Sequence, residues 1–151
     1  MGERVLLEVQ TDATPPSPEA VLETAGDDVE TRVETITRVL TRMVLEDGAL
    51  FRSQMRVTQD LWFARQGDPS GPVREGRRLA SIDRALEPVA NRVPPGVLQR
   101  LREALAVVVG VEPVISSRDV CGLSPDATEE VLVWTATSIV RAALSGDRQQ
   151  L

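Results

Sequence analysis

The last third of the chain, residues 95–144, predicts two long apolar helices that meet at a short turn. In the first, apolar side chains recur every three, four or seven residues and share one stripe, which comprises Val97, Leu98, Leu101, Ala104, Leu105, Val108, Val111 and Ile115. The second begins clearly, because Ser124 suits the N-cap and Pro125 suits the first helical position. It carries no charge from Val131 to Val140. Because apolar side chains lie on more than one side of both helices, we expect a partner to cover what the chain's own core does not.

Helices are also predicted upstream, where no alternating pattern typical of a strand is long enough to compete. Asp27 or Asp28 caps the first and clearest of them, and its polar side chains are expected to face water: Glu30, Arg32, Glu34, Arg38 and Arg42. Asp47-Gly48 ends this helix, and a second runs over about residues 49–66. A third opens at Pro72 and ends before the prolines that precede the C-terminal helices.

The chain is therefore predicted to be all-α, with one main folded domain. Residues 1–26 form an N-terminal segment with a short helix and a proline-rich loop, residues 27–145 form the helical domain, and residues 146–151 form a tail. Pro113 lacks the backbone N–H that a helix interior requires, so we expect it to kink the helix that begins at Pro95.

Missing residue types exclude several kinds of chemistry. The sequence has no histidine and no lysine, which removes Ser–His triads, His-ligated metals and Schiff bases, so we expect no enzyme, no metal and no cofactor. The net charge of −6 argues against DNA binding by this chain alone. No apolar run reaches the length of a membrane span and the N-terminus has no signal-peptide core, so a cytoplasmic protein is expected. The single cysteine, Cys121, excludes an intrachain disulfide and is expected in the core.

Charged clusters are mostly expected to be structural. Two acidic groups lie in predicted first helical turns, which favour negative charge; they comprise Asp27, Asp28 and Glu30, and Asp126, Glu129 and Glu130. Arg74, Arg77 and Arg78 are expected to form a solvated face rather than an anion site. Glu112 differs, because it is the only charge in residues 104–117 and burying it unpaired is costly. It either reaches solvent at a groove or meets an arginine or a ligand, and structural pairing is favoured.

A row of aromatic and thioether side chains is the best candidate for a ligand cavity. Phe51, Met55 and Trp62 recur on the second predicted helix. Such a stripe is usually core, but in a chain this poor in aromatic residues it can also line an apolar cavity. Together with the following helix and Glu112, the predicted ligand-binding set is Phe51, Met55, Trp62, Leu79, Ile82, Leu86, Val108 and Glu112.

The C-terminal half resembles the effector-binding and dimerisation domain of TetR-type transcriptional repressors. The resemblance rests on the apolar helix of residues 98–117, the turn of residues 118–125 and the final helix of residues 129–144, and it covers roughly residues 27–145. Such repressors begin with a helix-turn-helix module, which nothing in residues 1–26 matches. The resemblance implies a helical bundle whose last two helices form a four-helix dimer contact. It also implies that a bound effector shifts the helices and hence the DNA-reading heads of the complete regulator.

We therefore expect a homodimeric regulatory domain that senses a small, largely apolar effector and carries no DNA-binding head in this chain. On the last helix, the residues expected to face the core are Leu132, Ala136, Ile139 and Ala143. The remaining apolar strips predict the dimer interface, which comprises Ala106, Val107, Gly110, Pro113, Val114, Val133, Trp134, Thr137, Val140, Arg141 and Leu144. The alternative is a helical homodimeric protein-interaction module without a small-molecule site, and a ligand-sized cavity distinguishes the two.

Overall fold

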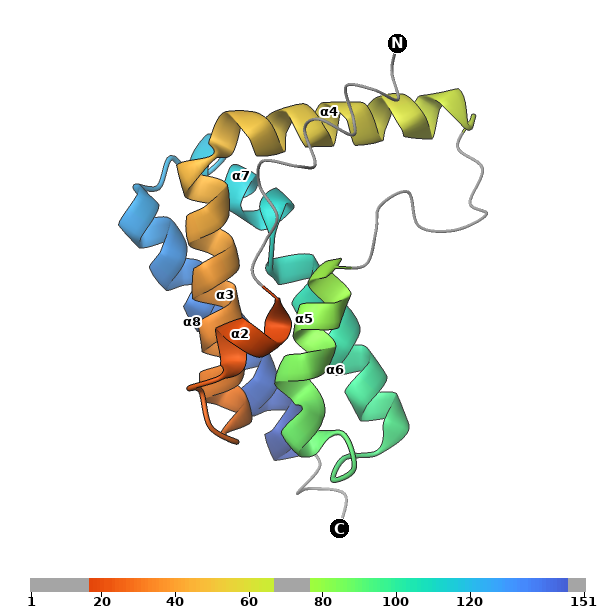
Figure 1. The fold of residues 1–151 in the computed structure, drawn as a ribbon, viewed down its shortest axis with the longest axis vertical. Coiled ribbons are helices and arrows are strands. Elements are labelled where there is room, and N and C mark those ends of the chain that lie inside the picture. The colour runs from red at the N-terminus through yellow and green to blue at the C-terminus, as the bar shows by residue number, and fades with distance from the viewer. Residues whose placement is uncertain (1–16, 67–76, 147–151) are drawn as a thin grey trace.

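The computed structural model of the protein describes residues 17–66 and 77–146, and every regular element in these ranges is a helix (Figure 1). In chain order the elements are α2 (Pro18–Leu22), α3 (Val29–Glu46), α4 (Gly48–Ala64), α5 (Arg77–Leu86), the 3-10 helix η1 (Glu87–Val89), α6 (Pro95–Val108), α7 (Val111–Asp119) and α8 (Pro125–Gly146). The predicted all-α class is confirmed for this part of the chain. The predicted helix start at Pro72 and the short helix predicted for the apolar patch of residues 5–9 lie outside the described residues.

α3 forms the centre of the bundle. It lies along α8 and also contacts α2, α5 and α7, while α6 packs against α5 and α8. α4 starts at the end of α3 and runs across the top of the molecule, so that its C-terminal half extends away from the other helices (Figure 1). The bundle therefore has a compact body and one projecting helix.

The core consists of two apolar clusters that follow one another along α3. The larger cluster takes buried side chains from α2, α3, α5, η1, α6 and α8, among them Val33, Ile36, Ile82, Leu86, Leu101, Leu105, Ala136 and Val140. The smaller cluster comprises Val44, Phe51, Val111, Val114 and Leu132. Because burial of one such side chain contributes roughly 1.5–3 kcal/mol, these clusters supply the main favourable term in folding.

Local hydrogen bonds fix the starts of the two longest helices. The Asp28 carboxylate accepts a hydrogen bond from the Thr31 N–H at 2.8 Å, so Asp28 rather than Asp27 caps α3. Ser124 Oγ accepts a hydrogen bond from the Ala127 N–H at 3.2 Å at the start of α8. Each cap satisfies a backbone N–H that has no partner inside its helix. Both predicted helix starts are confirmed.

α6 and α7 are two helices, not the single helix that the apolar stripe predicts. α6 ends at Val108, Val109 is extended with φ −114° and ψ 132°, and α7 begins at Val111. The kink predicted at Pro113 is therefore wrong, because the break lies one turn earlier. A proline ring inside a helix collides with the carbonyl four residues before it, which here belongs to Val109. Once Val109 leaves the helix, Pro113 lies in the first turn of α7, where no N–H is needed.

Two further side chains lie where the sequence does not predict them. Arg32, expected to face water, is buried and donates to three backbone carbonyl oxygens at the end of α5 and in the turn between α2 and α3. Cys121, expected in the core, is exposed in the turn between α7 and α8. The chain bends there around Gly122, whose φ is +63°, and the turn lies at the surface.

The core-facing sector of α8 is broader than the sequence predicts. Ala136 is buried as expected, but Val133, Thr137 and Val140 are also buried within the single chain. α8 contacts α3, α6 and α7, so the covered part of its surface spans both predicted stripes. The predicted division into a core stripe and a partner stripe is therefore wrong, and Trp134 is the large hydrophobic side chain of α8 that stays exposed.

Candidate functional site

A polar cluster joins α5 to the break between α6 and α7. Arg78, in the first turn of α5, donates from Nη1 to the Ala106 carbonyl oxygen at 2.8 Å and from Nη2 to Glu112 Oε2 at 2.5 Å. Its side chain is only 23% exposed. Ala106 lies in the last turn of α6 and Glu112 in the first turn of α7. The guanidinium thus neutralises the negative end of one helix and pairs with a carboxylate at the positive end of the next.

Gly110 leaves the room that this guanidinium occupies. It adopts φ 115° and ψ −152°, a backbone conformation that is essentially restricted to glycine. A Cβ atom at Gly110 would lie 2.6 Å from Arg78 Nε. A side chain here would therefore strain the backbone and displace the arginine. We call Arg78, Ala106, Gly110 and Glu112 the junction cluster.

The junction cluster settles two predictions from the sequence. The pairing expected for Glu112 is confirmed, and its partner is Arg78. The solvated face expected for the arginines is wrong for Arg78, while Arg77 is exposed and Arg74 lies outside the described residues. Sequence reasoning missed the role of Arg78 because its partners are 28 and 34 residues away. The sequence feature that could have indicated this contact is Gly110 close to Glu112, the lone carboxylate of an apolar stretch.

The predicted ligand-binding residues do not form one group. Ile82 and Leu86 are buried in the larger cluster, and Val108 packs against that cluster. Phe51 is buried in the smaller cluster, where Met55 is half-buried beside it. The set is therefore divided between two parts of the core, and the ligand cavity itself stays a prediction.

The rest of the predicted ligand-binding set lies nearer the surface. Trp62, close to the end of α4, is 48% exposed and meets Phe63 edge-on, with ring centroids 5.1 Å apart. Leu79 is half-buried in the first turn of α5. The other end of α4 is held by Arg52, whose Nη1 donates to Asp119 Oδ2 at 2.7 Å. This hydrogen bond lowers the pKa of the Asp119 carboxyl below its ordinary value.

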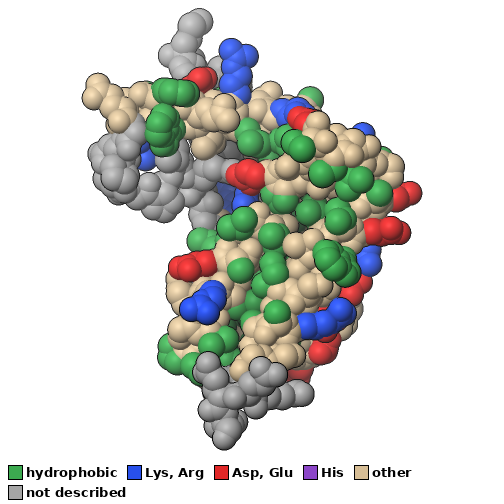
Figure 2. Space-filling view, turned by 180° about the vertical axis from the view of Figure 1, so that it is seen from behind, with side chains coloured by type: hydrophobic (Ala, Val, Ile, Leu, Met, Phe, Trp, Pro, Cys, Tyr) green, Lys and Arg blue, Asp and Glu red, His purple; other side chains and the backbone are tan. Residues whose placement is uncertain are grey.

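Large hydrophobic side chains remain exposed on both α6 and α8. Val107 on α6 is 73% exposed and Trp134 on α8 is 66% exposed. Trp134 shares a helical stripe with Val131, Ser138 and Ala142, and none of these is charged or fully buried. In the view from behind, hydrophobic side chains gather over the middle of the molecule (Figure 2). We call these five residues the outer face.

The predicted dimer residues divide between the outer face and the core. Val107 and Trp134 belong to the outer face, and Arg141 is exposed and pairs with Glu30. Half-buried members of the predicted interface are Ala106, Pro113 and Leu144. Members buried within the single chain are Gly110, Val114, Val133, Thr137 and Val140. The expectation that the buried members face away from the core is wrong, because neighbouring helices of the same chain cover them.

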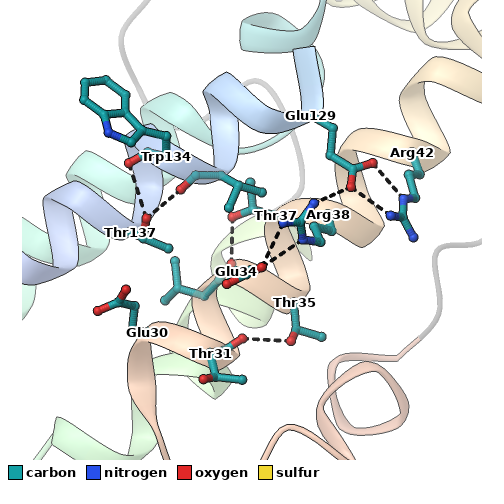
Figure 3. Close-up of polar contacts among 12 residues, drawn as sticks. Glu30, Thr31, Glu34, Thr35, Thr37, Arg38, Arg42, Glu129, Trp134 and Thr137 are labelled. Atoms are coloured by element: carbon teal, nitrogen blue, oxygen red, sulfur yellow. Dashed lines mark hydrogen bonds and ion pairs between the residues drawn. The ribbon is translucent and has the colours of Figure 1, made fainter. Parts of the chain in front are cut away.

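Ion pairs fasten the start of α8 to α3. Glu129 lies between two arginines of α3, with Arg38 Nη1 at 2.6 Å and Arg42 Nε at 2.7 Å from its carboxylate oxygens (Figure 3). The hydrogen bonds from Arg42 and Arg38 hold the pKa of Glu129 below its ordinary value. Glu129 thus has a structural role, as expected, but through ion pairs with α3 and not in the first turn of α8, where the acidic residue is Asp126. The ring of Trp134 points away from α3 in the same view.

Comparison of this chain with protein-family models, curated proteins and solved structures finds no match in any of the three. Among the described residues, no group of three or more acidic, cysteine or histidine side chains is arranged to hold a metal ion. None of the helices described combines the length and the apolar composition that a membrane crossing requires.

Proposed function

We propose that this chain is a homodimeric regulatory domain that senses a small, largely apolar molecule, similar to the TetR-type domains that its sequence resembles. The observation that carries the proposal is the outer face, where Val107 and Trp134 stand exposed on two helices that pack side by side. An uncharged hydrophobic strip of this kind is unfavourable in water. In a two-fold symmetric dimer, the outer face of each copy packs against the outer face of the other, and both are removed from water.

The smaller cluster is the region that best suits a ligand. Met55 has a flexible thioether chain and lies half-buried against the buried Phe51. Both belong to α4, which projects from the body and is tied to α7 through Arg52 and Asp119. A movement of α4 relative to α7 would open this cluster. For an effector to shift α4, the ligand must bind the two positions of α4 with different affinities.

Four measurements test the proposal. Sedimentation at micromolar concentration is expected to give a dimer, and a monomer would reject the dimeric part. A thermal-shift screen with apolar metabolites is expected to raise the melting temperature for at least one class. In a Trp134→Phe variant, the same ligand is expected to change the fluorescence of Trp62, since both Trp62 and the smaller cluster involve α4. With a net charge of −6, the chain is expected to show no sequence preference in gel-shift titrations with duplex DNA.

A second candidate is a helical homodimeric interaction module without a small-molecule site. It is favoured by the packing of Phe51 into one core cluster and of Ile82 and Leu86 into the other. Both candidates predict the dimer. A dimer that responds to no member of a broad apolar library, in melting temperature or in Trp62 fluorescence, supports the module over the sensor.

A further inference from the structure

Arg78 takes the place of a backbone donor that the end of α6 has lost. In a continuous helix, the Ala106 carbonyl would accept from the N–H four residues later, which belongs to Gly110. The helix ends before that bond, at Val108, and Val109 is extended. Arg78 Nη1 donates to the same carbonyl at 2.8 Å instead. One side chain of α5 therefore satisfies the end of α6.

The same guanidinium also holds the start of α7. Its Nη2 donates to the Glu112 carboxylate at 2.5 Å, and Gly110 lies directly beneath its Nε. α7 contacts α3 and α8, α6 contacts α5 and α8, and α6 and α7 also contact each other. Arg78 therefore bonds to both sides of the break from a helix that is neither α6 nor α7.

The apolar pattern of this segment does not by itself set the position of the break. The apolar stripe of residues 97–115 keeps helical spacing across the break, so nothing in its pattern requires α6 to stop at Val108. The break is maintained instead by Pro113, by the conformation of Gly110 and by the bonds from Arg78. Of these three, only the Arg78 contacts can be made and broken without rebuilding the backbone.

We infer that Arg78 is a conformational latch. While Arg78 is bonded to Ala106 and Glu112, it holds α6 and α7 in their present relative position. When these bonds break, residues 106–113 unfold locally while the rest of the bundle stays folded. The inference goes beyond the proposed function, because it requires neither a ligand nor a dimer. In this inference, the Arg78 contacts act as a switch between two positions of α7 relative to α6.

Hydrogen–deuterium exchange of the full chain tests the latch. Arg78→Met is expected to raise amide exchange in a peptide covering residues 105–115 by about tenfold or more, the size expected for loss of a charged hydrogen bond. Peptides from α3 should keep their exchange rates. The matched control is Arg102→Met, which removes another ion pair between α6 and α5, with Arg102 Nε 2.5 Å from Asp83 Oδ1, away from the break.

The control variant should leave the 105–115 peptide unchanged. Unchanged exchange of that peptide in Arg78→Met overturns the latch, and so does an equal rise in every peptide, which would show a general loss of stability. If Arg78→Met does not fold, Glu112→Gln is measured in its place. It weakens one of the two Arg78 bonds, and a smaller rise confined to the same peptide is expected; no rise there rejects the inference.

A double variant separates the latch from backbone strain. Gly110→Ala adds a Cβ that would lie 2.6 Å from Arg78 Nε, so it both displaces the arginine and strains the backbone. In the Arg78→Met background only the strain remains. The combined effect on exchange of the 105–115 peptide is therefore expected to be smaller than the product of the two single effects. A simple product would mean that Gly110 and Arg78 act independently, which contradicts the latch.

Discussion

Arg32 and Ala85 are joined by a buried hydrogen bond, from Arg32 Nε to the Ala85 carbonyl oxygen at 3.2 Å. The two other donor nitrogens of the same guanidinium, Nη1 and Nη2, reach the carbonyl oxygens of Gly26 and Arg84, each at 2.8 Å. Arg84 and Ala85 lie in the last turn of α5, where carbonyls lack partners inside the helix. One arginine thus ties α3 to the end of α5 and to the turn that precedes α3.

Replacing Arg32 is expected to be strongly destabilising. Arg32→Met leaves buried carbonyl oxygens without donors, which should lower the free energy of unfolding by about 2–3 kcal/mol. Urea denaturation followed by circular dichroism measures the change. Arg100→Met, at an exposed position of α6, serves as control and should stay within about 0.5 kcal/mol of the original chain. Equal stabilities of the two variants would contradict the structural role of Arg32.

The two adjacent aspartates before α3 should differ in their contribution to stability. Asp28 accepts hydrogen bonds from both the N–H and the hydroxyl of Thr31, at 2.8 and 2.6 Å, whereas Asp27 is exposed and does not cap the helix. Asp28→Ala is therefore expected to cost about 1 kcal/mol in the free energy of unfolding, and Asp27→Ala clearly less. Thermal and urea unfolding of the pair provide the comparison. A larger loss for Asp27→Ala would reject Asp28 as the cap.

The Glu129 network predicts a specific dependence of stability on pH. Hydrogen bonds from Arg42, and then from Arg38, lower the pKa of Glu129 in the folded protein below its ordinary value of 4.5. As the pH falls, Glu129 therefore becomes protonated at a higher pH in the unfolded chain than in the folded chain. The stabilisation is present above pH 4.5 and is lost as the pH falls through the lowered native value.

Glu129→Gln, which cannot ionise, tests this dependence. The variant should be less stable than the original chain at neutral pH, and the difference should shrink as the pH falls below 4.5. Urea unfolding at a series of pH values gives both curves. A difference that stays constant over this range would show that ionisation of Glu129 does not contribute.

A substitution in the outer face is expected to disrupt the dimer without unfolding the chain, unlike a substitution in the core. Val107→Glu replaces a side chain that is 73% exposed in one chain, so the fold should persist while two facing carboxylates disrupt the contact between copies. Sedimentation velocity should show a shift from dimer to monomer, with unchanged helical circular dichroism. Val120→Glu is the control, because Val120 is 80% exposed but lies outside the outer face. A Val107→Glu chain that remains fully dimeric rules out this interface.

Val140→Glu distinguishes the observed core from the one that the sequence predicts. If Val140 faced a partner, the substitution would split a dimer of folded chains. Val140 is 1% exposed within a single chain, so an unpaired carboxylate there should instead unfold the bundle. Loss of the helical circular dichroism signal at neutral pH is the expected result. A folded, monomeric Val140→Glu chain would contradict the packing of α8.

Features that depend on neighbours in the sequence could be predicted. The apolar spacing indicates helices, and the ends of α3 and the start of α8 follow from Asp28, Asp47-Gly48 and Ser124, whose hydrogen bonds reach only three or four residues. The need of Glu112 for a partner also followed from sequence, because a lone carboxylate in an apolar stretch is costly to bury. Pro113 predicts an interruption of the helix, but the sequence did not indicate that the break between α6 and α7 would lie one turn before this proline.

Only the tertiary structure decides what lies far apart in the chain. Arg32 and Arg78 bond to carbonyls 52 and 28 residues away, and nothing near either residue in the sequence indicates that it will bond to the end of another helix. The exposed side of α8 likewise depends on where α3, α6 and α7 pack, and this places Val140 in the core and leaves Trp134 outside. Helical periodicity fixes which residues share a stripe, because that is a property of 3.6 residues per turn. Which stripe is buried depends on the helices that pack against it, and the periodicity of a single helix does not indicate which helices these are.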